Sequence, residues 1–186
     1  GWGPTDTPRV EGIYNDDTSF VRMNDSTVTA IGGAEAFGLD NMRGSAYIET
    51  SDIGIKGSNF NTYSGIRNIL PESSLTMRNS TINVSGESAG IAYLNGIENN
   101  DAGIVQLFDS TISASGNGTY AVGIRGGGDA PALLALNNIK VDVFGTNKYN
   151  YGIYYGDAPV VIRDSFIYAH DGAQAIGLYF QDSGAP

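Results

Sequence analysis

An arginine and two tyrosines recur at one position of a short sequence repeat. Arg125, Tyr154 and Tyr179 each lie two residues after the glycine of a Gly-Ile or Gly-Leu dipeptide. Equivalent positions of successive repeats stack in space, so these side chains are expected to form a row. Tyr149 and Tyr168 add aromatic side chains in the same C-terminal half. Flat rings flanked by hydrogen-bonding groups suit sugar faces, and these five are the predicted ligand-binding residues. The alternatives are aromatic stacking that only stiffens the protein, and a surface that another part of the full protein covers.

Residues for catalysis or for metal binding are sparse. The chain has one histidine, His170, and no cysteine, which excludes thiolate metal sites and cysteine nucleophiles. The oxygen-rich segments at Asp16–Asp17, 99–101 and Asp129 fall in expected loops, and are interpreted as solvated turns rather than Ca²⁺ ligands. Hydrolysis of polysaccharides requires paired carboxylates. We therefore expect no catalytic residue, no metal and no cofactor; a polysaccharide lyase or hydrolase is the alternative.

The composition narrows the classes of fold and partner. Twenty acidic and ten basic residues give a net charge of -10, which disfavours binding to nucleic acids. Only 16% of the residues are charged, while 41% are hydrophobic and 26 are glycine. A helical bundle needs more charged helix formers, and a disordered chain would have fewer apolar residues. The composition predicts many short strands joined by tight turns.

Two sequence phrases alternate along the chain. One is the Gly-Ile or Gly-Leu dipeptide, which recurs every 25 to 33 residues. Its glycines are Gly12, Gly38, Gly65, Gly90, Gly123, Gly152 and Gly177. The other is an Asn/Asp-Ser phrase such as MRNSTINVSG, in which apolar residues alternate with polar ones on both sides of the serine. Its anchor residues are Ser26, Ser51, Ser80, Ser110, Ile139 and Ser165.

The alternation changes phase at the anchor, which predicts two strands separated by a bend. The residue before the anchor is usually Asn or Asp, and these residues tolerate the left-handed backbone of such a bend. The glycine predicts a third strand, entered through a sharp corner.

Three strands per repeat predict an all-β, right-handed parallel β-helix with six to seven coils of 25 to 33 residues each. Asn15, Asn41 and Asn68 are expected to form an amide ladder. In later coils this position is expected to hold Tyr93, Tyr155 and Phe180. The longest connection, Leu94–Ile104, is a second candidate binding segment because rigid scaffolds carry binding residues on loops.

The phrases STINVSGESAGI at 80–91, STISASGNGTYAVGI at 110–124 and SFIYAHDGAQAIGL at 165–178 resemble autotransporter passenger repeats. Autotransporter passengers are secreted adhesins of Gram-negative bacteria with a pertactin-like, pectin-lyase-like β-helix. The resemblance implies that residues 1–186 are one β-helix segment of a longer passenger, tethered by a C-terminal outer-membrane barrel that this chain lacks.

The resemblance also implies a location and a class of partner. It places the protein outside the cell, at the bacterial surface. The expected partner is a host surface glycan, an extracellular-matrix protein, or the same protein on another cell. A polysaccharide-degrading enzyme and a structural stalk or phage fibre segment are the alternatives.

Overall fold

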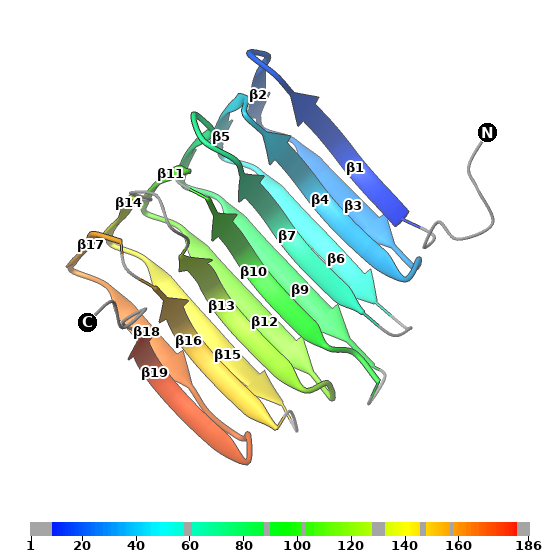
Figure 1. Ribbon diagram of the computed structural model, residues 1–186, viewed down its shortest axis with the longest axis vertical. Coiled ribbons are helices and arrows are strands. Elements are labelled where there is room, and N and C mark those ends of the chain that lie inside the picture. Colours follow the sequence, from blue (N-terminus) through cyan, green and yellow to red (C-terminus); the bar gives the residue numbers. More distant parts are fainter. Residues whose placement is uncertain are drawn as a thin grey trace.

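The computed structural model is an all-β parallel solenoid with three strands per coil (Figure 1). It describes residues 9–57, 61–87, 90–101, 103–127, 133–145, 148–156 and 158–181. The nineteen strands in these ranges form three sheets of seven, six and six strands. Each strand pairs in parallel with its equivalent in the neighbouring coil, which confirms the predicted repeat architecture. No helix that could cross a bilayer occurs in these ranges.

The seven-stranded sheet, called the long sheet below, carries the recurring glycines. It contains β1 (Arg9–Asp16), β4 (Glu35–Met42), β7 (Thr62–Ile69), β10 (Tyr93–Asn100), β13 (Tyr120–Gly127), β16 (Tyr149–Tyr155) and β19 (Gln174–Phe180). The second sheet contains β2 (Phe20–Asn24), β5 (Ser45–Glu49), β8 (Ser74–Arg78), β11 (Ile104–Phe108), β14 (Leu133–Asn137) and β17 (Val160–Arg163). The third sheet contains β3 (Thr27–Ile31), β6 (Asp52–Gly57), β9 (Thr81–Gly86), β12 (Thr111–Gly116), β15 (Lys140–Gly145) and β18 (Phe166–Ala169).

The bend between the second and third sheets is built as the sequence predicts. The residue before each anchor has a left-handed backbone, with φ between 46° and 56°. These residues are Asp25, Thr50, Asn79, Asp109, Asn138 and Asp164. The serine anchors then link successive coils. The hydroxyl of Ser80 accepts a hydrogen bond of 3.1 Å from the backbone N–H of Ser51 and donates one of 2.6 Å to the carbonyl of Arg78.

The apolar columns predicted on both sides of the anchor form the interior. Ile53, Ile82, Ile112 and Val141 are at most 1% exposed and belong to one core cluster with Leu75, Val105 and Leu134. Stacking the coils removes this surface from water, which is the main source of solenoid stability.

Six of the seven recurring glycines lie inside strands of the long sheet rather than at the entrance to a strand, so the sharp corner predicted there is wrong. None of them has a positive φ. A Cβ at Gly65 would lie 2.2 Å from Cγ2 of Ile82 and 2.7 Å from the carbonyl oxygen of Gly96. The glycine therefore lets two coils and the third sheet approach closely. Since both this position and the following Ile66 face the interior, the strand must bend here.

The fourth coil uses a different glycine from the one predicted. Ile97, and not Ile91, pairs with Ile66 and with Ile124, so Gly96 takes the place assigned to Gly90. The segment Leu94–Ile104 is consequently not a long loop, because β10 spans most of it and β11 begins at Ile104.

The inward amide ladder is confirmed for Asn15, Asn41 and Asn68, and it continues to Asn99 rather than to Tyr93. The amide nitrogen of each asparagine donates to the amide oxygen of the next, at 2.6, 2.6 and 2.8 Å. Asn99 in turn donates to the hydroxyl of Tyr155 at 2.6 Å. All four asparagines are at most 3% exposed, so each ladder bond satisfies a buried polar group.

Candidate functional site

The outer face of the long sheet carries a second packed layer outside the core. In its middle column, the five residues from β4 to β16 are buried: Phe37, Ser64, Asn95, Val122 and Tyr151 are 2%, 0%, 0%, 2% and 7% exposed. None of the apolar members belongs to the core cluster. The flanking columns cover this middle column; the guanidinium of Arg67, for example, lies 4.2 Å from the ring centre of Phe37. The bend at each glycine thus turns the outer face into a surface that can enclose side chains.

A pocket of about 180 Å³ opens in the C-terminal half of this face. It is lined by Tyr93, Tyr120, Val122, Arg125, Tyr151, Tyr154 and Tyr179, from β10, β13, β16 and β19. Strand register brings these residues together. Tyr93 pairs with Tyr120, and Arg125 with Tyr154, which pairs with Tyr179.

Two tyrosine stacks flank the pocket. Tyr93 and Tyr120 lie 4.9 Å apart with ring planes at 11°, and Tyr120 and Tyr149 lie 4.9 Å apart at 16°. Tyr154 and Tyr179 form the second stack, at 5.0 Å and 18°. These spacings match the distance between neighbouring strands. Tyr120 is stacked on both ring faces. It can therefore contact a ligand only through its ring edge and its hydroxyl.

Tyr151 lies between the two stacks. It packs edge-on against Tyr154 at 5.3 Å and tilted against Tyr179 at 5.5 Å. Burial raises the pKa of Tyr151 above its ordinary value, and the neighbouring tyrosines add to this effect. Its hydroxyl therefore remains a protonated hydrogen-bond donor at neutral pH. The hydroxyl of Tyr154 already donates to the side-chain oxygen of Gln181, and keeps its capacity to accept.

Arg125 is the charged residue of the pocket lining. Its guanidinium lies 4.4 Å from the ring centre of Tyr93, in a cation–π contact. Within the described part of the chain, no carboxylate lies at ion-pair distance from Arg125. The pocket therefore combines phenol groups with one positive charge, on a protein whose net charge is -10.

The structure brings together most of the predicted binding residues. Arg125, Tyr154 and Tyr179 line the pocket, as their shared repeat position predicts. Tyr149, the first residue of β16, supports the pocket by stacking on Tyr120. Tyr168 lies elsewhere, on β18 of the third sheet, so the structure does not bring it together with the other four.

Tyr168 belongs instead to an aromatic strip on the third sheet. Its ring lies 5.8 Å from that of Phe166 and 4.6 Å from that of His170. His170 also stacks on Phe144 at 5.5 Å, and its ring nitrogens lie 2.6 Å from Asp171 and 3.3 Å from Asp142. The histidine is therefore held in a turn by two carboxylates and two rings.

Four residues of the pocket lining, Tyr93, Tyr120, Val122 and Tyr151, are not among the five predicted binding residues. Tyr93 was placed on the inward ladder because the fourth coil was aligned on the wrong glycine, six residues too early. Val122 and Tyr151 each come directly before a recurring glycine and pair in register. The alternation of polar and apolar residues does not predict that this outward position is buried.

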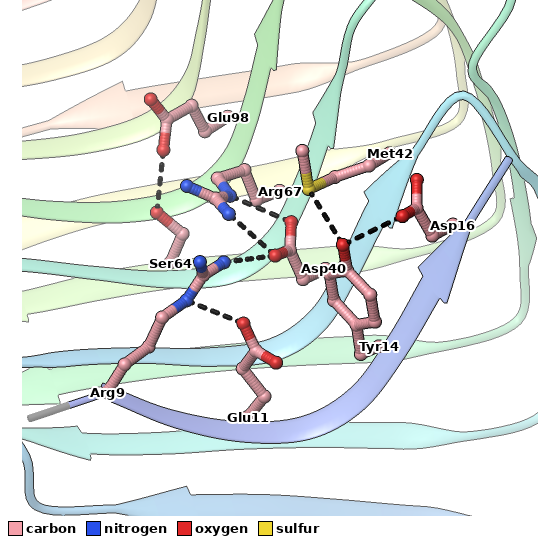
Figure 2. Close-up of polar contacts among 9 residues, drawn as sticks. All are labelled: Arg9, Glu11, Tyr14, Asp16, Asp40, Met42, Ser64, Arg67 and Glu98. Carbon is pink, nitrogen blue, oxygen red and sulfur yellow. Dashed lines mark hydrogen bonds and ion pairs between the residues drawn. The ribbon is translucent and has the colours of Figure 1, made fainter. Parts of the chain in front are cut away.

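A charged cluster occupies the N-terminal end of the same outer face (Figure 2). Asp40 has no exposed side-chain surface, and Arg67 donates two hydrogen bonds to its carboxylate, at 2.8 and 2.6 Å. Arg9 also donates to Asp40, and its Nε lies 2.5 Å from Glu11. β1 curves around the side chains of Arg9 and Glu11, as Figure 2 shows.

The charges of this cluster neutralise one another. Burial disfavours the charged form of Arg67, but the hydrogen bond and charge of Asp40 outweigh it and raise the pKa of Arg67. Burial raises the pKa of Glu11, against the opposing charge of Arg9. Since both oxygens of Asp40 are bonded to arginines, the cluster orders the first coils and offers no free carboxylate pair.

The oxygen-rich segments do not form a metal site among the described residues, where no group of three or more His, Cys, Asp or Glu is placed to hold an ion. Asn99 is buried in the amide ladder, and Asp16 accepts a hydrogen bond of 3.0 Å from Tyr14. Asp129 lies outside the described residues.

Comparisons with protein-family models, with curated protein sequences and with solved structures yield no match to this chain.

Proposed function

We propose that this protein binds glycans without modifying them, and that the tyrosine-lined pocket of the long sheet is its binding site. The observation that carries the proposal is the lining itself: five tyrosines and one arginine around a pocket of about 180 Å³. Phenol hydroxyls and ring edges provide both hydrogen bonds and apolar contact, which are the two interactions that a sugar requires.

The rigidity of the scaffold supports this proposal. The lining residues are strand residues whose neighbours in register are fixed by ladders of backbone hydrogen bonds. Stacking within each tyrosine row further restricts the side chains, so that little conformational freedom is lost on binding. A pocket that is ordered before the ligand arrives is typical of small-molecule and saccharide sites.

The biological setting follows from the resemblance to autotransporter passengers and is part of the same proposal. The protein would act outside the cell, as an adhesin-like segment at a bacterial surface. Its glycan would belong to a host surface. A matrix protein, or a second copy on another cell, would be recognised through protein contacts that do not depend on this pocket.

A paired substitution tests the proposal. Tyr154→Ala with Tyr179→Ala removes one tyrosine stack, and we expect labelled protein to lose its binding on a glycan array. Phe166→Ala with Tyr168→Ala is the matched control, because it removes two neighbouring exposed rings from the third sheet. Unchanged array binding by the Tyr154 and Tyr179 variant, with thermal unfolding showing that it is folded, would count against the pocket.

The degradative alternative has its own readout. A lyase would release unsaturated uronates from an acidic polysaccharide, and a hydrolase would release new reducing ends. Incubating the protein with pectate and with neutral polysaccharides, followed by assays for both products, separates catalysis from binding.

A further inference from the structure

We propose that the glycan bound in the pocket is an acidic one, and that Arg125 binds the carboxylate of its sugar. This inference rests on the proposed function and adds to it the chemical class of the ligand. It depends on a difference between Arg125 and the other arginines of the same outer face.

The arginines at the N-terminal end of the outer face are neutralised. Arg67 makes two hydrogen bonds to Asp40, and Arg9 contacts both Asp40 and Glu11. Arg67 and Arg125 occupy the same outward column, two coils apart, with Glu98 between them. Glu98 accepts hydrogen bonds from Ser64 and Asn100. The positive charge of Arg125 thus has no protein carboxylate paired with it in the described part of the chain.

The position of Arg125 suits a carboxylate. The ring of Tyr93 supports the guanidinium through a cation–π contact, which holds the group without occupying its N–H donors. A guanidinium can bind a carboxylate through two parallel hydrogen bonds, an arrangement that is short and strong. The tyrosines that line the same pocket carry phenol hydroxyl groups, which can form hydrogen bonds with sugar hydroxyls.

The net charge of the protein should restrict acidic saccharides to the pocket. With a charge of -10, most of the surface repels an anion, whereas the pocket lining carries a single positive charge and no acidic residue. An acidic saccharide should therefore bind only where its carboxylate reaches Arg125.

Calorimetric titration with two matched pairs of saccharides tests this inference. The first pair is 3′-sialyllactose and lactose, and the second is trigalacturonic acid and its methyl ester. Sialic acid and uronic acid share the carboxylated ring, and the two pairs distinguish between these sources. For the wild-type protein we expect at least one acidic member to bind about tenfold or more tightly than its neutral counterpart.

Two arginine variants locate the effect. Arg125→Gln should abolish the preference for the acid. Arg78→Gln is the matched control, because Arg78 lies 3.9 Å from the ring centre of Phe108 in the same kind of cation–π contact, but on the second sheet. It changes the net charge equally and should retain the preference.

The outcomes separate this inference from the proposed function. Equal binding of acidic and neutral members, or a preference that survives in Arg125→Gln, would overturn the role of Arg125 and leave glycan binding in place. If the wild-type protein bound none of the four saccharides, both the acidic class and the glycan proposal would be overturned for these sugars.

Discussion

The side-chain amide of Asn99 donates a hydrogen bond of 2.6 Å to the hydroxyl of Tyr155, although two coil steps separate the residues. Gly126 occupies the equivalent position in the coil between them. The ring of Tyr155 passes through the space that a side chain at Gly126 would fill. The buried asparagine ladder therefore ends on the phenol of Tyr155. The hydrogen bond from Asn99 can reach this phenol only because Gly126, in the coil between them, has no Cβ.

Replacing Gly126 by alanine should destabilise the protein by about 2 kcal/mol or more, because overpacking a filled interior forces side chains or backbone to move. The new Cβ would lie 2.2 Å from Cε2 of Tyr155 and 2.6 Å from the carbonyl oxygen of Asn99. Gly54→Ala is the matched control, since its nearest neighbour would be 3.7 Å away. Urea unfolding should show a large loss for the first variant and little or no loss for the second.

Tyr155 should also make stability depend on pH in the alkaline range. Burial raises its pKa above the ordinary value of 10.0, and the hydrogen bond from Asn99 only partly opposes this. A raised pKa means that the folded state holds the proton more tightly than the unfolded state. The associated stability is thus complete below about pH 10 and is lost as the pH rises above it.

The Tyr155→Phe variant isolates this contribution. At pH 8 we expect it to lower the free energy of unfolding by about 1 to 3 kcal/mol, because the buried amide of Asn99 loses an acceptor. Between about pH 9 and pH 11, its stability should fall less steeply than that of the wild-type protein. Parallel curves for the two proteins over this range would contradict the assignment.

Thr50 is the one β-branched residue among the six bend positions before the anchors. Its φ of 48° is left-handed, a region that β-branched side chains adopt only with strain. Thr50→Asn should raise the free energy of unfolding by about 1 kcal/mol, because asparagine tolerates this backbone. The reverse change at an equivalent bend, Asn79→Thr, should lower the free energy of unfolding by a similar amount. Thermal unfolding of both variants and of the wild-type protein measures the two changes. A loss of stability in Thr50→Asn would show that contacts of the threonine outweigh the strain.

The sequence was sufficient to predict the coils because polarity and bends repeat together. Apolar columns around the anchors indicate which residues face inward, and the Asn or Asp before each anchor marks the bend. The fourth coil could not be aligned reliably, because two Gly-Ile dipeptides, at Gly90 and Gly96, lie six residues apart. The inward amides decide between them: only the second places Asn99 in hydrogen-bond contact with Asn68.

The pocket was only half predictable for a different reason. Arg125, Tyr154 and Tyr179 share a repeat position, so alignment alone predicts that they lie in one row. Alignment does not reveal that the long sheet bends where two successive residues face inward, which encloses Tyr151 and Val122. Alignment also does not show which outward-facing columns lie close together in space. The sequence therefore groups Tyr168, which lies on β18 of the third sheet, with residues of the long sheet.

Asp40 should be among the most sensitive positions for stability. It is fully buried between Arg67 and Arg9, so Asp40→Asn leaves the partly buried guanidinium of Arg67 without its counter-ion and leaves Arg9 with Glu11 alone. Removing one partner of a buried ion pair costs about 3 kcal/mol or more. Glu87→Gln is the control, because it also removes one carboxylate from an ion pair. That pair, with Lys56 at 3.0 Å, is exposed, and its loss should cost less than about 1 kcal/mol.

Urea unfolding of these two variants measures the difference directly. Because solvent screens the exposed pair, added salt should diminish the small effect of Glu87→Gln. The effect of Asp40→Asn should persist, since the guanidinium groups of Arg67 and Arg9 also pack on the ring of Phe37 and cannot turn to water without disrupting that contact. Equal losses in the two variants would indicate that water replaces the carboxylate of Asp40, and that the cluster contributes no more than a surface ion pair.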